Sequence, residues 1–234
     1  MTVDTNITKE LRTKLLESGA TLVGFADMQS VGAENLPYAA CVLIPLPVAV
    51  VNDISDAPTV EYWDTYISVN NLLDEIVNAG ATFLHGKGYS ALPVTRENAV
   101  WNAGTMCADY PYKTVATRAG LGWIGKSCLL ITPQYGSAVR IATLFTDAPL
   151  NCDTPVEKSC CGNCDLCRAN CPADAIHGAT WVPAMERELL VDTTKCRETM
   201  KKRMKQINGF EATICGKCFA VCPYTKKYLR KNGY

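Results

Sequence analysis

Cysteine spacing is the feature of this 234-residue chain that most directly implies chemistry, since nine of its thirteen cysteines lie between Cys160 and Cys222. One run, from Cys161 to Pro172, has the spacing C-x₂-C-x₂-C-x₃-C-P. A shorter run, C-x₂-C-x₃-C-P, ends at Pro223, and Cys196 lies between the two. Thiolates at these separations curl a loop around one face of an iron-sulfur cube, and the fourth cysteine of the longer run reaches a second cube. The spacing predicts two [4Fe-4S] clusters.

The ligands of each cluster follow from the crossed order that two-cluster ferredoxins use. The first set is Cys161, Cys164, Cys167 and Cys222, and the second set is Cys171, Cys196, Cys215 and Cys218. Two zinc ribbons are the alternative, but four closely spaced cysteines ending in C-P do not have ribbon spacing. The chain also has only two histidines, so imidazole contributes little to any metal site.

The remaining cysteines divide into two groups. Cys41 and Cys128 lie inside or beside apolar runs, where free cysteine is usually a small buried hydrophobe. Cys107, Cys152 and Cys160 stay undecided between structural and chemical roles.

Composition and charge limit the setting in which this chemistry takes place. No apolar run reaches the roughly 18 residues of a membrane span, and the polar stretch from Met1 to Glu10 does not resemble a signal peptide. We therefore expect a cytoplasmic electron carrier or reductase. From Lys195 to Tyr234 the chain has eleven basic and two acidic residues. This basic tail indicates either a dock for nucleic acid or an acidic protein, or counter-charge for negatively charged clusters.

The elements that must position these cysteines are of mixed type, which predicts an α+β fold. Apolar residues at helical spacing predict helices over 6–18 and 59–85. Apolar or alternating runs closed by turn residues predict strands over 20–26, 40–51, 129–132 and 138–146. We expect two domains, 1–151 and 152–234, of which the second is the iron-sulfur module.

A glycine-rich loop from Gly120 to Ser127 satisfies two nucleotide-binding patterns at once, G-x-G-x-x-G and G-x₄-G-K-[ST]. Both patterns need a strand before the loop and a helix after it. Here a helix-compatible stretch, 114–119, precedes the loop, and a strand-like stretch, 129–132, follows it. The order is wrong for nucleotide binding, so we interpret the glycines as a place where backbone approaches a large planar or anionic ligand.

Three stretches together resemble one family. They are 116–126, the apolar stretch that ends at 144–150, and the double-cluster module. In this combination the chain resembles epoxyqueuosine reductases and the related reductive dehalogenases. The resemblance implies a nitroreductase-like cobalamin-binding domain followed by a ferredoxin-like double [4Fe-4S] domain. It also implies a cobalamin-dependent oxidoreductase whose clusters supply single electrons to a corrin.

Roles for individual residues also come from this resemblance. The residues implied to line the corrin are Gly120, Gly122, Trp123, Gly125 and Lys126, with Thr146 and Asp147 closing the strand beside it. No D-x-H-x-x-G motif is present, which implies a base-off corrin with no histidine below the cobalt. The proton donor is expected to be Asp109 or the pair Tyr112 and Lys113, with a nearby cation lowering the pKa of the phenol.

The partners stay open at this level. A low-potential donor of the ferredoxin or flavodoxin type is expected to supply electrons, and no membrane partner is expected. Epoxyqueuosine reductases continue into a helical repeat domain that helps hold tRNA, whereas this sequence ends at Tyr234. A tRNA, a small molecule and a corrinoid protein are therefore all retained as substrates. The alternative is a docking protein that binds no corrin and reduces another protein's cofactor.

Overall fold

The computed structural model describes the chain except for residues 1–4, 32–34, 55–57, 98–100, 103–106 and 109–111, and of 101–102 and 107–108 it describes only the backbone. The chain forms two compact units, each assembled from three segments. We call the first the sheet unit: Met1–Ile44, Val69–Leu121 and Arg140–Val156. We call the second the cysteine unit: Pro45–Ser68, Gly122–Val139 and Glu157–Tyr234.

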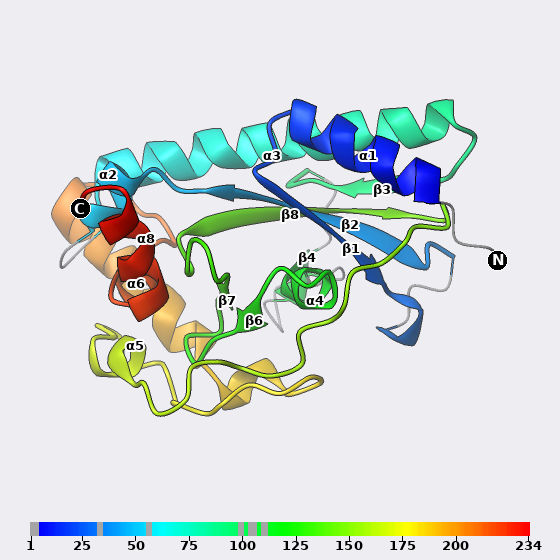
Figure 1. Ribbon diagram of the computed structural model, residues 1–234. Coiled ribbons are helices and arrows are strands. Elements are labelled where there is room, and N and C mark those ends of the chain that lie inside the picture. Colours follow the sequence, from blue (N-terminus) through cyan, green and yellow to red (C-terminus); the bar gives the residue numbers. More distant parts are fainter. Residues whose placement is uncertain (1–4, 32–34, 55–57, 98–100, 103–106, 109–111) are drawn as a thin grey trace. The chain divides into compact units, whose positions relative to one another are not determined.

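Helices and strands alternate irregularly along the chain (Figure 1), which confirms the predicted α+β class. The helices are α1 (Thr5–Glu17), α2 (Val48–Asn52), α3 (Val60–Gly86), α4 (Tyr112–Arg118), α5 (Leu166–Ala169), α6 (Thr193–Asn208), α7 (Lys217–Ala220) and α8 (Pro223–Lys231). The strands are β1 (Leu22–Asp27), β2 (Tyr38–Pro45), β3 (Ala91–Val94), β4 (Trp101–Asn102), β5 (Cys107–Ala108), β6 (Trp123–Ile124), β7 (Leu130–Ile131) and β8 (Val139–Thr146).

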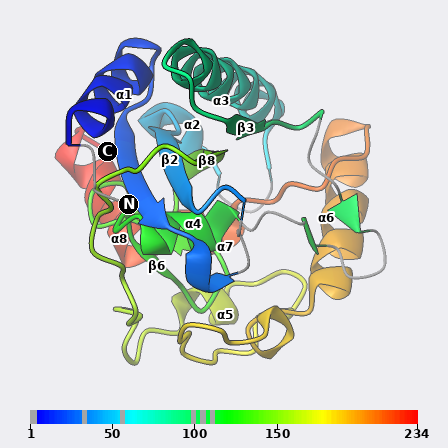
Figure 2. The ribbon, with the colours of Figure 1, turned by 90° about the vertical axis from the view of Figure 1, so that its right-hand side faces the viewer.

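The sheet unit is built on a four-stranded sheet in the order β1-β2-β8-β3. β1 pairs antiparallel with β2, and β3 pairs antiparallel with β8 so that Ala91 lies opposite Thr146. α1 and α3 cover one face of this sheet, and α4 lies on the other face (Figures 1 and 2). The core between helices and sheet contains Leu11 and Leu15 of α1 and Ile76 of α3, all fully buried. The apolar spacing that predicted the two helices is therefore the spacing of this core.

One predicted strand, 40–51, is wrong in its second half. β2 ends at Pro45, and the apolar residues beyond it form the short helix α2. Pro47 stands at the N-cap of α2 with an extended backbone. Proline lacks the N–H that a strand ladder needs and fits well at the start of a helix, so the two prolines change the backbone within a run that stays apolar.

The cysteine unit has a separate core. Leu46 and Val50 from the α2 region pack with Tyr62 of α3, Phe219 of α7 and Leu229 of α8. Tyr62 and Phe219 meet edge to face, with their ring centroids 5.7 Å apart. Apolar residues from 45–68 are therefore the base on which the cysteine-bearing segments are packed.

The two units do not coincide with the consecutive segments 1–151 and 152–234 that the sequence suggests. α3 begins in the cysteine unit and continues into the sheet unit, and the glycine-rich loop divides between them after Leu121. A domain boundary near residue 151 stays a proposal about functional modules. Among the described helices, none combines the length and apolar character needed to cross a membrane.

Candidate functional site

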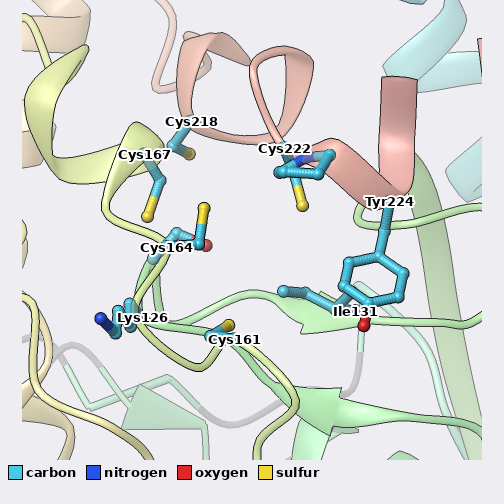
Figure 3. Close-up of a pocket in the computed structure, with 10 residues that line it drawn as sticks. Lys126, Ile131, Cys161, Cys164, Cys167, Cys218, Cys222 and Tyr224 are labelled. Atoms are coloured by element: carbon cyan, nitrogen blue, oxygen red, sulfur yellow. The ribbon is translucent and has the colours of Figure 1, made fainter. Parts of the chain in front are cut away.

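A pocket in the cysteine unit brings together all four members of the first predicted ligand set (Figure 3). Its cysteines are Cys161, Cys164, Cys167, Cys222 and, from the other set, Cys218. The other lining residues are Lys126, Ser127, Ile131, Pro223 and Tyr224. Residues from three distant stretches of the sequence therefore enclose one sulfur-lined space.

The electrostatic neighbours of the thiols in this pocket are one another. Burial raises the pKa of the Cys167 thiol to about 11, the backbone N–H of Arg168 lowers it, and Cys161, Cys164 and Cys222 raise it further. Burial likewise raises the pKa of Cys222, and its cysteine neighbours are Cys161 and Cys164. These four, which we call the first quartet, form one mutually interacting group.

The other four predicted ligands form a second quartet. Burial raises the pKa of Cys196 to about 11, and Cys171 and Cys215 raise it further. Burial raises the pKa of Cys218 strongly, and among the neighbouring thiols Cys215 and Cys196 add most to this rise. Cys171 is also a neighbour of Cys215. The electrostatic contacts thus group the eight thiols as the crossed order predicts, and the binding of a cluster by either group stays a prediction.

The two quartets meet at one place. Cys218 belongs to the second quartet, but it also lines the pocket of the first and interacts with Cys167 (Figure 3). Among the described residues, no three His, Cys, Asp or Glu side chains are close enough to hold a single metal ion. Soft thiolate donors in groups of four suit iron-sulfur clusters.

Short helices and caps set the direction of the cysteines. α5 begins one residue before Cys167, and Gly216, in a left-handed conformation with φ of 80°, turns the chain into α7. Asp192 caps α6, its carboxylate accepting a hydrogen bond from the Lys195 N–H at 2.8 Å, and this fixes the helix turn that carries Cys196. Pro223 opens α8 directly after Cys222.

The glycine-rich loop continues into a hairpin of β6 and β7 and not into a helix, as the sequence predicted. A Cβ on Gly122 would lie 2.1 Å from the Ile131 carbonyl oxygen. A Cβ on Gly125 would lie 2.4 Å from Cδ1 of Ile131 and 3.6 Å from Sγ of Cys161. Close packing on Ile131 therefore accounts for both glycines. It also places Gly125 next to Cys161 of the first quartet.

The residues around Gly125 form a wall of the cysteine pocket. Lys126 and Ser127 are buried and line it. Trp123 lies behind this wall and meets the ring of Tyr224 edge to face, with centroids 4.9 Å apart. Its buried Nε1 has no hydrogen-bond partner in the described structure. Sequence reasoning missed Ser127, Ile131 and Tyr224, since only the tertiary structure brings them to the cysteines.

The other residues implied to line a corrin have local structural roles in the sheet unit. Gly120 has φ of +69°, and a Cβ there would lie 2.9 Å from the Thr154 carbonyl oxygen. The hydroxyl of Thr146 donates to the Ser90 carbonyl at 2.7 Å, and Asp147 accepts from the Ser90 N–H at 2.8 Å. These bonds hold the ends of β3 and β8 together. Contact of these residues with a cofactor stays a prediction.

Of the candidate proton donors, Asp109 lies outside the described residues, whereas Tyr112 is half-buried at the start of α4. Burial, followed by the Asp74 carboxylate, raises the pKa of Tyr112, and Arg140 opposes this rise. The expected lowering of that pKa is therefore wrong. The hydroxyl donates to the Val94 carbonyl at 3.4 Å.

Arg140 acts on Tyr112 and is itself bonded to Asn70, and neither residue stood out in the sequence. Arg140 donates from Nε to the side-chain carbonyl of the buried Asn70 at 3.0 Å. Lys113, the predicted companion of Tyr112, lies in the same first turn of α4. A role of these groups in proton transfer stays a prediction.

The cysteines outside the quartets differ in environment. Cys41 and Cys128 are buried, which confirms the interpretation of both as core residues. Cys160 is exposed, and Cys152 is partly buried. The side chain of Cys107 lies outside the described structure.

Comparison with known proteins identifies one segment and a group of relatives. Residues 160–225 match a family described as "4Fe-4S double cluster binding domain". The chain is similar to the epoxyqueuosine reductases of Synechococcus sp. strain CC9605 (36% identity, 58% of this chain and 42% of that protein) and of Listeria monocytogenes (34%, 48% and 29%). The chain thus spans less than half the length of these curated relatives.

Solved structures share the fold. A catabolic reductive dehalogenase superposes with a TM-score of 0.72 at 20% identity, covering 93% of this chain and 32% of that one. An epoxyqueuosine reductase in complex with a modified tRNA stem loop superposes with a TM-score of 0.62 at 20% identity, covering 93% and 65%. The predicted fold resemblance to both groups is confirmed.

Proposed function

We propose that this chain is an iron-sulfur oxidoreductase in which two [4Fe-4S] clusters deliver single electrons to a corrin. The observation that carries the proposal is the division of eight cysteines into two quartets that meet at Cys167 and Cys218. The match of 160–225 to a double-cluster domain supports the number of clusters. The named relatives support a reductase.

The thiols of the two quartets come from different segments of the chain. The first quartet takes its thiols from the segment 161–167 and from Cys222, directly before α8. The second takes Cys171 after α5, Cys196 from α6, Cys215 before α7 and Cys218 from α7. Partial burial of these thiols raises the cost of leaving their charges uncompensated. When bound, the clusters would supply one-electron transfer at low potential. A ferredoxin or flavodoxin would supply the electrons to this chain.

The corrin part of the proposal is supported by the shared fold. One reductive dehalogenase structure, with a TM-score of 0.70, is described as suggesting a mechanism for B12-dependent dehalogenation. In the described structure, Ile131 and the Thr154 carbonyl fill the space beside Gly122, Gly125 and Gly120. These glycines therefore offer no open cradle, and we assign no step of the reaction to them.

A proton donor completes the proposal. Tyr112 is protonated at neutral pH, as any phenol is, and burial and Asp74 raise its pKa above the ordinary value. Asp109 is the rival donor. Replacing Tyr112 with Phe is expected to lower turnover while leaving corrin binding unchanged. Turnover equal to that of the unchanged chain would assign the role to Asp109, and Asp109→Asn is the matched variant.

The experiment for the main proposal is anaerobic reconstitution followed by an absorbance titration with cobalamin. We expect about eight iron atoms per chain, a change in the corrin spectrum and co-elution of corrin with protein on a sizing column. Full iron content with no spectral change and no co-elution would eliminate the corrin. It would support the alternative of an electron-transfer protein that reduces a partner's cofactor.

A second candidate is a tRNA epoxyqueuosine reductase. Its support is the set of named relatives together with the basic tail, eleven basic against two acidic residues from Lys195 onward. Lys202 and Lys205 of α6 and Lys226 and Lys227 of α8 are all exposed. Phosphate binding by such side chains gives an affinity that falls steeply with salt. Absence of a tRNA mobility shift at low salt would remove this candidate.

A further inference from the structure

Lys126 is a buried cation in the wall of the cysteine pocket. Its side chain is only 10% exposed. A buried ammonium group is unfavourable unless an opposite charge compensates it, so the surroundings of Lys126 must contain that charge when the protein is in its working form.

The acidic group that the structure provides is insufficient for this purpose. Asp165 Oδ1 lies 3.9 Å from Lys126 Nζ, at the outer limit of an ion pair, and its side chain is 44% exposed. The other carboxylate oxygen of Asp165 pairs with Arg168 at 3.3 Å. One solvent-screened carboxylate is therefore shared by two cations.

The second source of negative charge is the first quartet. Lys126 lines the same pocket as Cys161, Cys164, Cys167 and Cys222 (Figure 3). The preceding residue, Gly125, is packed so that a Cβ there would lie 3.6 Å from Sγ of Cys161. A cluster held by four thiolates brings net negative charge to this space, and the electrostatics of the site must include the charge of the bound group.

We propose that Lys126 is the counter-charge of the first cluster and raises its reduction potential. Reduction adds one electron to the cluster, and the positive charge of Lys126 stabilises the added negative charge. The inference rests on the two-cluster part of the proposed function and not on the corrin. It also gives the G-x₄-G-K-[ST] pattern a role, because its lysine lines a pocket of cysteines.

The test is a potentiometric titration of the cluster-loaded protein with dithionite as the reductant, followed by electron paramagnetic resonance. In K126M we expect one of the two reduction steps to move to lower potential. At a fixed potential the ratio of reduced to oxidised cluster should fall about tenfold, which corresponds to about 59 mV for one electron. K126R keeps the charge and is expected to restore the original value. D165N removes the opposing charge and is expected to shift the same step in the opposite direction by a smaller amount.

Lys217 is the matched control, since it acts on Cys215 of the second quartet. K217M is expected to shift the other reduction step. Unchanged potentials in K126M with full iron content would overturn the proposal, as would equal shifts in K126M and K126R. If K126M fails to assemble its cluster, the polar, uncharged variant K126Q is titrated in the same way, and an unchanged potential in cluster-loaded K126Q would overturn the proposal. Failure of the unchanged chain to bind two clusters would instead refute the proposed function.

Discussion

The two cysteine quartets have equal numbers of thiols but different surroundings. The first lines a pocket whose wall contains Lys126 and Tyr224. The second contains Cys196 of α6 and Cys218 of α7, both partly buried, and Arg203 and Lys217 act on its Cys215. The same four-thiol chemistry is therefore placed once beside the glycine-rich loop and once beside the basic helices.

This difference teaches that ligand spacing alone does not determine the properties of a cluster. Charges near the ligands and burial tune the reduction potential of a cluster, and the ligand spacing does not set either of them. The first quartet depends on the β6–β7 hairpin for its wall, and the second depends on the cap of α6. The two sites should therefore respond separately to changes in these elements.

The largest expected effect is the loss of one cluster. C222S in the first quartet and C196S in the second should each lower iron and sulfide content to about half, since each cluster needs its four thiolates. Exposed Cys160 is the control, and C160S should keep the full content. C218S should additionally alter the resonance signal of the remaining cluster, because Cys218 also lines the first pocket. Equal spectra of the remaining cluster in C218S and C196S would contradict this contact.

The next effect concerns the wall of the first quartet. In G122A the new Cβ would lie 2.1 Å from the Ile131 carbonyl oxygen, which the backbone must move to avoid. We expect the thermal unfolding midpoint to fall by about 5 to 10 °C, as overpacking of about 2 to 3 kcal/mol implies. Circular dichroism at a fixed heating rate measures it.

G86A is the matched control, because nothing lies within 4 Å of a Cβ at Gly86 in α3. It should leave the midpoint unchanged or raise it slightly. The first cluster should be the one lost earlier in G122A. Earlier loss of the second cluster would contradict the prediction that the β6–β7 hairpin supports the first quartet.

Two hydrogen bonds support different quartets, so removing one bond at a time should destabilise one cluster site at a time. The buried Thr225 hydroxyl in α8 accepts from the Ser137 N–H at 3.1 Å, close to Cys222 in sequence. T225V should cost about 1 to 2 kcal/mol, since that N–H loses its partner. D192A removes the cap of α6 and should cost about 1 kcal/mol.

Cluster loss to a chelator, followed by absorbance, separates the two variants. T225V should release the first cluster faster, and D192A the second. Exposed Thr194 provides the control T194V, which should behave as the unchanged chain. If the same cluster leaves first in both variants, the prediction that each hydrogen bond supports a different quartet is wrong.

The smallest effect concerns a cysteine outside both quartets. Burial raises the pKa of Cys152 to about 11, with Asp27 and Asp153 adding to the rise and Arg118 opposing it. Alkylation at pH 8 should therefore be roughly a hundredfold slower than for an ordinary thiol, since the thiolate is the reactive form. Mass spectrometry of iodoacetamide-treated protein measures this rate, with exposed Cys160 as the reference.

The same raised pKa fixes the sign of a pH effect on stability. The folded state holds the Cys152 proton more tightly than the unfolded state, so its contribution is complete below the ordinary thiol pKa and is lost as the pH rises through about 11. C152S should show a shallower alkaline loss of stability. Identical alkaline profiles of C152S and the unchanged chain would contradict this assignment.

Much of the fold and of the cysteine site could be predicted from local patterns. The long helix α3 follows from apolar spacing, and the division of the eight thiols follows from C-x₂-C steps. Both are short-range properties, in which neighbours in sequence remain neighbours in space. The run 40–51 failed because its apolar character is the same in β2 and α2, and only prolines mark the change.

The sequence by itself determined which residues could be cluster ligands, because ligand spacing within a loop is fixed by the length of the backbone. Only the tertiary structure decided which other residues face them. Lys126 lies 35 residues before Cys161, and Tyr224 lies 57 residues after Cys167. Folding of the β6–β7 hairpin and α8 brings both to one pocket. Such long-range contacts depend on packing of whole elements, which no local pattern in a single sequence records.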